Sequence, residues 1–192
     1  SADGGLTWQE SYYDKERSEP LLGIWGLPQG PVFAFGSFGR FLVSPDLGKT
    51  WQQRDVGVED HHVNGLAGDA DGHMMLVGEQ GIVERSSDGG ATWQTVPKFY
   101  RGSFFGAIRL SADEWILYGM RGNAFYTRDF GATWQQSQIP MPTSMFGHLV
   151  TADGTIFLIG AGGTIVASHD RGASFAMVRA GGMASYTSVL PL

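Results

Sequence analysis

The side chains that could carry out chemistry in this chain are mainly arginines, tyrosines and carboxylates. The sequence has ten arginines, six tyrosines and 19 aspartates and glutamates. One reaction that such side chains can support is hydrolysis of an acidic sugar, with arginines that clamp the substrate carboxylate, a tyrosine nucleophile paired with a glutamate, and an acid/base carboxylate. The residue types for such a glycoside hydrolase are present, but no local spacing groups them. We therefore predict no catalytic residue from the sequence.

Motifs for metals and cofactors are incomplete. The Gly-Lys-Thr at 48–50 resembles the end of a phosphate-binding loop, but Val43 stands where the leading glycine would be. Residues 69–72 begin like a calcium loop, lack its downstream glutamate, and are interpreted as a turn between strands. His61 and His62 are adjacent and would point to opposite faces of a strand. We predict no cofactor and no metal site.

Composition excludes several classes of protein. The 192 residues carry a net charge of −6 and no cysteine, so thiol nucleophiles and cysteine-ligated metals are excluded. Nucleic-acid binding needs a basic footprint that this acidic chain does not supply. No apolar run is long enough to span a membrane, which argues against direct membrane insertion. The high glycine content, 29 residues, requires another explanation.

The strongest signal is a pattern that occurs five times, Ser/Thr-x-Asp-x-Gly-x-Thr/Ser-Trp/Phe. The copies begin at residues 1, 44, 86, 127 and 168. Further glycines keep the same register in front of each of the last four copies, for example Gly65, Gly78 and Gly81. The glycine excess is therefore a property of a repeat of about 42 residues.

Short apolar runs between these landmarks predict strands. Each repeat has three runs rich in β-branched and aromatic residues, and a fourth begins at the aromatic residue of the repeated motif. No window shows a convincing helical stripe. Four antiparallel strands in about 42 residues are typical of one blade of a β-propeller, so we predict an all-β propeller fold.

The repeated motif has the chemistry of a hairpin between the third and fourth strands. Its aspartate can accept backbone N–H bonds, its glycine can adopt positive φ, and its aromatic residue can pack at the blade edge. We interpret every motif as structural. Its aspartates, glycines and aromatic residues are Asp3, Gly5, Trp8, Asp46, Gly48, Trp51, Asp88, Gly90, Trp93, Asp129, Gly131, Trp134, Asp170, Gly172 and Phe175.

This motif resembles the Asp-box, or BNR, repeat of sialidases and of many non-enzymatic propellers. The stretches 77–93 and 100–134 look more narrowly like the photosystem II stability/assembly-factor-like family, in its bacterial, non-photosynthetic branch. The resemblance implies a seven-bladed ring, export to the periplasm or cell envelope, and a role in assembling a membrane-protein complex. A charge of −6 departs from the basic ring surface of photosynthetic members, so a photosystem partner is not implied.

The phase of the repeat predicts the domain organisation. Residues 1–192 form one propeller domain, with blade units ending near residues 11, 54, 96, 137 and 178. Residues 184–192 match the innermost strand of a further blade. We therefore expect the chain to be about four and a half blades of a larger propeller.

Variable residues in a constant frame indicate where binding occurs. The turns between second and third strands, and the connections between blades, differ from repeat to repeat and lie opposite the Asp-box hairpins. Some aromatics, such as Phe38, Phe99 and Phe104, are not fully explained by the repeat. The candidate binding residues form a mixed-charge ring: Arg40, Glu79, Gln80, Tyr100, Arg101 and Arg121.

These observations favour a non-catalytic propeller that binds a protein partner, as a scaffold or assembly factor for an envelope membrane complex. Aromatic residues beside arginines are typical of protein interfaces. Two alternatives remain open, a sialidase-like glycoside hydrolase and a carbohydrate-binding propeller without turnover.

Overall fold

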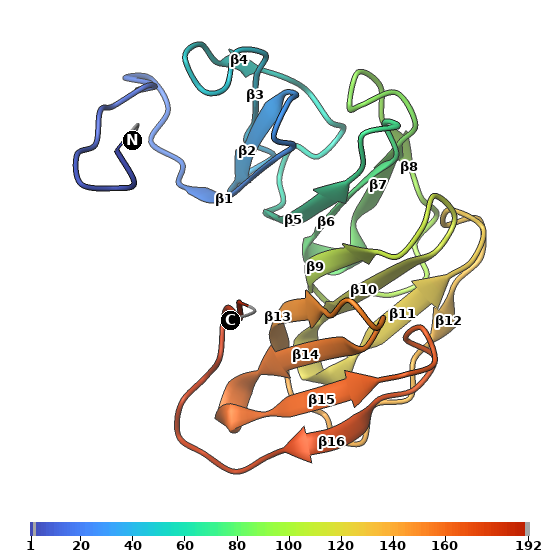
Figure 1. Cartoon of the computed structure of the whole chain (residues 1–192). Coiled ribbons are helices and arrows are strands. Elements are labelled where there is room, and N and C mark those ends of the chain that lie inside the picture. Colours follow the sequence, from blue (N-terminus) through green and yellow to red (C-terminus); the bar gives the residue numbers. More distant parts are fainter. Residues whose placement is uncertain (2, 191–192) are drawn as a thin grey trace.

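The computed structural model describes residues 1 and 3–190 and consists of four antiparallel sheets of four strands each (Figure 1). This confirms the predicted all-β propeller fold. In that part of the chain no helix has the length and apolarity needed to cross a bilayer. The first blade contains β1 (Leu21–Gly26), β2 (Val32–Gly36), β3 (Phe41–Ser44) and β4 (Gln52–Gln53).

The other three blades repeat this order and add a 3-10 turn after the second strand. The second blade contains β5 (Val63–Gly68), β6 (Met74–Gly78), η1 (Glu79–Gly81), β7 (Val83–Ser86) and β8 (Gln94–Thr95). The third contains β9 (Phe104–Arg109), β10 (Trp115–Gly119), η2 (Met120–Gly122), β11 (Ala124–Thr127) and β12 (Gln135–Gln136). The fourth contains β13 (Met145–Val150), β14 (Ile156–Gly160), η3 (Ala161–Gly163), β15 (Ile165–Ser168) and β16 (Ala176–Arg179).

The blades are arranged around a common centre. Strands β1, β5, β9 and β13 are innermost, and the two-residue strands β4, β8 and β12 lie at the rim (Figure 1). Because strand direction alternates, the Asp boxes and the turns after the inner strands lie on one side, which we call the box face. The turns after the second strands, and the connections between blades, lie on the opposite side, which we call the turn face.

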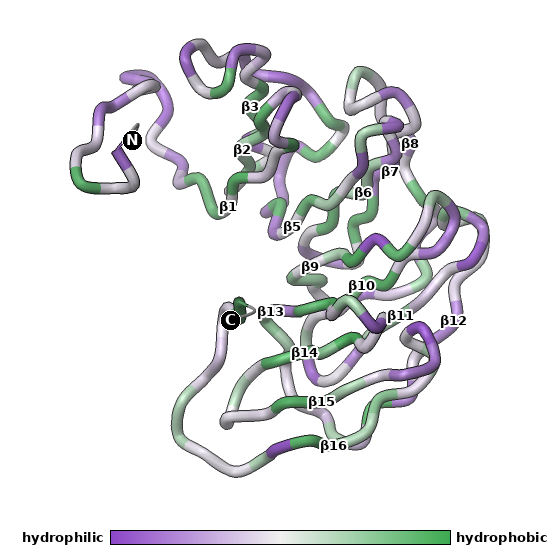
Figure 2. Tube along the Cα trace, viewed as in Figure 1, coloured by the Kyte–Doolittle hydropathy of each residue, from purple (hydrophilic) through white to green (hydrophobic). Residues whose placement is uncertain are grey.

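The core lies between blades rather than within one of them. Phe41 of the first blade and Leu76 of the second belong to one buried cluster, and Trp115 of the third blade packs with Met75 of the second in another. Figure 2 shows hydrophobic residues along the strands and hydrophilic ones in the outer loops. Middle strands are therefore buried on both faces and read as continuous apolar runs.

Each Asp box is held by hydrogen bonds between its own residues. In the second blade, Asp88 Oδ1 accepts the backbone N–H of Thr92 at 2.9 Å, and Oδ2 accepts the Thr92 hydroxyl at 2.6 Å. The Ser86 hydroxyl accepts the backbone N–H of Gly90 at 2.9 Å. These bonds to Thr92 and Ser86 lower the pKa of Asp88 to about 2. The box of the second blade thus forms a hydrogen-bonded hairpin between β7 and β8.

The first box differs in what surrounds it. Asp3 makes the same two bonds to Thr7, at 3.0 and 2.6 Å. However, Trp8 is 79% exposed, whereas the equivalent Phe175 is 5% exposed. The expectation that Trp8 packs at a blade edge is wrong in this structure, because no strand of the described residues lies in front of it in the sequence to form an inner sheet.

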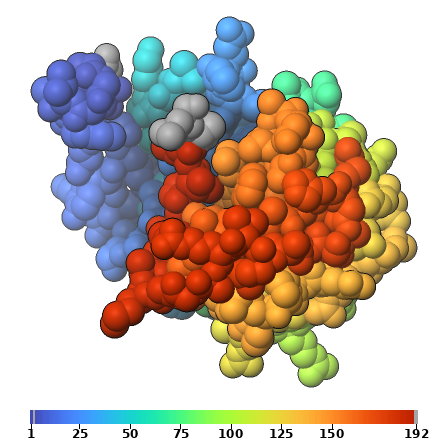
Figure 3. Space-filling view, turned by 60° about the horizontal axis from the view of Figure 1, so that its bottom comes forward, coloured from blue at the N-terminus to red at the C-terminus, as the bar shows by residue number. Residues whose placement is uncertain are grey.

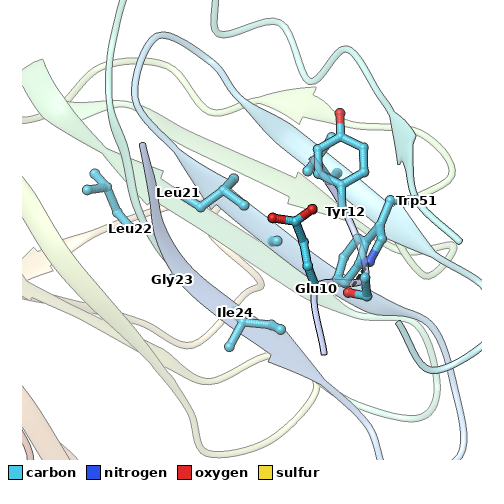
Figure 4. A pocket seen from close by; sticks show the side chains of 10 residues that line it. Glu10, Tyr12, Leu21, Leu22, Gly23, Ile24 and Trp51 are labelled. Atoms are coloured by element: carbon cyan, nitrogen blue, oxygen red, sulfur yellow. Dashed lines mark hydrogen bonds between the residues drawn. The ribbon is translucent and has the colours of Figure 1, made fainter. Parts of the chain in front are cut away.

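The face of the first blade that points away from the second blade is partly open. A cavity of about 440 Å³ is lined by Leu21 and Ile24 of β1 on one side and by Trp51, Glu10 and Tyr12 on the other (Figure 4). Ile24 is 68% exposed there.

The C-terminal segment follows the fourth blade without forming a strand between residues 180 and 190. The carbonyl of Ala184 accepts the backbone N–H of Gly163 at 2.6 Å, as the carbonyl of His61 accepts that of Gly39 at 2.9 Å. Residues 184–190 therefore start in the place that the inner strand of a next blade would take, against the fourth blade (Figure 3). Residues 191 and 192 of the predicted strand lie outside the described residues.

Candidate functional site

The turn face presents one residue of each blade at an equivalent tip position. These tip residues are Phe38, Gln80, Arg121 and Gly162, with φ of 52°, 52°, 55° and 64°. This left-handed conformation is disfavoured for residues with a side chain and is natural for glycine. Gly162 shows that the turn closes equally well with glycine. The side chains of the other three tips are therefore not required by the fold.

Connections between blades lie directly against these turns. A Cβ atom on Gly81 would overlap the carbonyl of Tyr100, and one on Gly122 would overlap that of Met141. The repeat glycines thus let the connection approach the turn closely. As a result, tip residues and connection residues share one continuous surface.

Four of the predicted binding residues gather around the connection between the second and third blades. Gln80, Arg101 and Arg121 are exposed, and Tyr100 is half-buried between them. The Tyr100 ring lies 5.1 Å from the ring of Phe104, and burial raises the pKa of its hydroxyl. The four residues therefore lie on one face of the propeller.

Glu79, which precedes Gln80 in η1, lies on the same face. Its Oε2 accepts the backbone N–H of His62 at 3.0 Å, and its Oε1 lies 3.6 Å from His62 Nδ1. The other side of the His62 ring meets Phe38 edge-on, with ring centroids 5.1 Å apart. Phe38 is 57% exposed. The turn face therefore combines an apolar tip, a histidine and a carboxylate with the two arginines.

Arg40 is not part of this surface, contrary to our expectation. It is 3% exposed, and its Nη2 donates to the hydroxyl of Tyr12 at 3.0 Å and to Asp14 Oδ2 at 2.8 Å. Arg40 lowers the pKa of Asp14 through this bond. The cause is the N-terminal segment, which lies beside the first blade and supplies an anionic partner. Arg40 ties that segment to the propeller.

Two other unexplained aromatics have a structural role. Phe99 stacks on Trp134 with centroids 4.9 Å apart, and Phe104 is fully buried. Phe38, in contrast, is on the surface. The sequence distinguishes Phe38 from Phe99 and Phe104 by its position in the repeat, which is equivalent to that of Gln80 and Arg121. No sequence pattern predicts that His62 belongs to this surface, because its contact with Glu79 depends on how two blades meet.

The four-stranded blades define the class as a β-propeller, and its repeated boxes resemble the BNR/Asp-box repeat. The BNR/Asp-box repeat family profile matches residues 125–136, which span the third blade's box. No curated protein sequence matches the chain significantly.

The propeller resembles two solved structures of Ycf48. One is Ycf48 bound to a D1 peptide, with a TM-score of 0.69, 18% identity, and coverage of 83% of this chain and 53% of that chain. The other is Ycf48 from Cyanidioschyzon merolae, with a TM-score of 0.68, 15% identity, and coverage of 83% and 56%. This chain therefore spans about half the length of these proteins.

A GH74 enzyme from Niastella koreensis also shares the fold. It has a TM-score of 0.66 and 16% identity, and the match covers 85% of this chain and 24% of that chain. At these identities the likeness concerns the fold, which both a peptide-binding protein and an enzyme use.

Proposed function

We propose that the chain is a non-catalytic Asp-box propeller that binds a protein partner through its turn face, as an accessory or assembly factor for a membrane complex of the cell envelope. The observation that carries the proposal is the set of tips Phe38, Gln80 and Arg121. Each holds a side chain in a left-handed conformation where Gly162 shows that glycine suffices. These side chains differ from blade to blade and lie with Tyr100 and Arg101 on one face, as expected for loops that carry recognition.

The chemistry of the turn face suits a protein partner. It offers an exposed aromatic ring at Phe38, a half-buried one at Tyr100, and two guanidinium groups at Arg101 and Arg121. Aromatic residues and arginine are enriched where protein interfaces are strongest. The capture of a D1 peptide by Ycf48, a protein of the same fold, supports the proposal by analogy.

The test uses the tips themselves. A variant with Phe38→Gly, Gln80→Gly and Arg121→Gly removes three side chains and relieves the backbone, so it should fold at least as stably as the parent. The matched control is Leu47→Gly, since Leu47 has φ of 58° and is 64% exposed on the box face.

The protein is produced in its native host, with a photoreactive residue at Arg101, and envelope complexes are isolated after cross-linking. We expect cross-links to a subunit of one membrane complex, lost in the triple glycine variant and kept in Leu47→Gly. Cross-links that survive the triple variant, or a protein confined to the cytoplasm, would overturn the proposal.

The second candidate is a glycoside hydrolase or a carbohydrate-binding propeller, favoured by the fold shared with GH74 enzymes. Within residues 1 and 3–190, the tyrosine hydroxyls that form hydrogen bonds do so with Arg40, Asp14, His148 and Gln135 rather than with a glutamate. Turnover of a fluorogenic sialoside would establish the hydrolase if it is lost on substitution of an arginine other than Arg121 and kept in the triple glycine variant.

A further inference from the structure

A second hollow lies at the opposite end of the inner strands, near the box face. Its volume is about 360 Å³, within the range of small-molecule sites. It is formed where β1, β5, β9 and β13 end, and its polar and aromatic lining comes from Trp25, Arg109 and His148. We call it the channel-mouth cavity. It is separate from the turn face, which lies at the beginning of the same strands.

The three side chains are not part of the repeat. Trp25 has Ala67, Ile108 and Leu149 at the equivalent strand positions, and these are aliphatic. Arg109 is likewise the single charged residue among its equivalents, which are Gly26, Gly68 and Val150. Small or aliphatic residues are therefore sufficient for the propeller fold at these positions. Trp25, Arg109 and His148 depart from this pattern and line the same cavity.

Arg109 is held in place by one edge of its guanidinium group. Its Nε lies 2.6 Å from Oδ2 of Asp69, whose side chain is 8% exposed. The other oxygen of that carboxylate, Oδ1, accepts the backbone N–H of His73 at 2.9 Å. No hydrogen bond or ion pair within residues 1 and 3–190 uses the two terminal nitrogens of Arg109. A guanidinium group oriented through Nε keeps its planar pair of terminal donors available for a carboxylate.

His148 is fixed by a buried tyrosine. Its Nδ1 lies 2.9 Å from the hydroxyl of Tyr118, which is 3% exposed. Partial desolvation of its ring lowers the pKa of His148, although the residue is exposed on one side, and this favours the neutral imidazole. Burial raises the pKa of Tyr118, so the phenol keeps its proton at neutral pH. When Tyr118 donates to Nδ1, the proton of the neutral ring is on Nε2. His148 then adds a third donor to the cavity.

Trp25 provides an aromatic wall. A Cβ atom on Gly68 would lie 2.9 Å from Cη2 of Trp25, so glycine at this position makes room for the indole. The ring is supported from behind by Phe33, with centroids 6.0 Å apart. A flat apolar group can stack on such a supported ring.

We propose that the channel-mouth cavity binds a small aromatic carboxylate. The carboxylate would accept from the terminal nitrogens of Arg109 and from Nε2 of His148, and the aromatic part would lie against Trp25. The carboxylate of Asp69 is already engaged by Arg109 and His73, so the free polar groups are donors and favour an anion over a cation. This site is independent of protein binding at the turn face.

The test compares 2-naphthoate with 2-naphthamide, its uncharged analogue, by NMR titration of the protein. We expect naphthoate to bind with a dissociation constant of roughly micromolar to millimolar strength. The amide should bind at least about tenfold more weakly, the factor that corresponds to losing one charge-assisted hydrogen bond. Equal binding of both compounds, or no binding of naphthoate at millimolar concentration, would overturn the proposal.

Two variants locate the site. Arg109→Lys retains a cation beside Asp69 but loses the planar pair of donors, and should weaken naphthoate binding about tenfold. Arg179→Lys, the same change on the exposed rim strand β16, should leave binding unchanged. If Arg109→Lys binds naphthoate as the parent does, the assignment is wrong. Denaturant unfolding of both variants checks that they are folded, and the amide comparison remains decisive if Arg109→Lys is not.

Discussion

Gly65 and Gly106 meet where the inner strands of the second and third blades pack together: a Cβ atom on Gly65 would lie 3.0 Å from the Cα of Gly106. The same atom would lie 3.1 Å from a methyl group of Val77. Neighbouring blades can approach this closely because neither residue has a side chain. One class of repeat glycine therefore serves packing between blades rather than turn geometry.

Replacing Gly65 by alanine should destabilise the propeller by about 1–3 kcal/mol, the usual cost of overpacking a close contact. Urea unfolding measures the free energy. Gly30→Ala is the control, because its Cβ would meet only Leu27 at ordinary distances of 3.5 Å or more. Equal stability of the two variants would show that the blades are less tightly joined than we infer.

Asp88→Ala should lower the melting temperature by several degrees, because it leaves the backbone N–H of Thr92 and the Ser86 hydroxyl without their acceptor. Asp3→Ala removes the same bonds from a box without a sheet behind it and should change the melting temperature much less. Circular dichroism on heating compares the two. A similar loss in both would mean that the first box contributes to global stability.

The Asp boxes should weaken only in strong acid. The pKa of Asp46 and of Asp88 is about 2 in the folded protein, below the ordinary value near 4, because box hydrogen bonds favour the carboxylate. The unfolded chain therefore binds protons first, and this part of the stability is lost as pH falls from about 4 to 2. Carbon-13 NMR titration of the carboxyl groups should find these two midpoints well below those of exposed aspartates.

Glu84 should have the opposite effect on pH dependence. It is 3% exposed on β7, and burial raises the pKa of its carboxyl to about 7. The unfolded chain releases this proton first, so its contribution is full below about pH 4.5 and is lost as pH rises through 7. Glu84→Gln should be more stable than the parent at pH 8 by about 1–2 kcal/mol, allowing for partial access of water, and similar at pH 4. Parallel pH profiles of the two proteins would contradict this.

The left-handed tips should reveal their backbone strain. Gln80→Gly should be about 1 kcal/mol more stable than Gln80→Ala, because alanine keeps a Cβ at φ of 52° and glycine does not. Chemical denaturation of both variants measures the difference. Higher stability of the alanine variant would mean that the side chain is not strained, and would remove the main support for the turn face as a binding surface.

The fold was predictable because the same pattern of strands and turns recurs in each repeat. Aspartates, glycines and aromatics recur at fixed intervals, and the turns and strands they specify depend on neighbours within a few residues. The candidate site was predictable in part. Gln80 and Arg121 were found from variability within a constant frame, whereas Arg40 was misplaced because its partner, Asp14, is distant in the sequence and has no motif.

The Asp-box hairpins follow from local sequence alone. Asp3 and Thr7 form the same hydrogen bonds as Asp88 and Thr92, even without an inner sheet behind them, because all the donors and acceptors lie within one short segment. Which arginines are available for binding, in contrast, depends on how distant segments pack. Arg40 is buried and Arg109 is oriented, because the packing of blades and terminal segment brings each of them to a carboxylate far away in the chain.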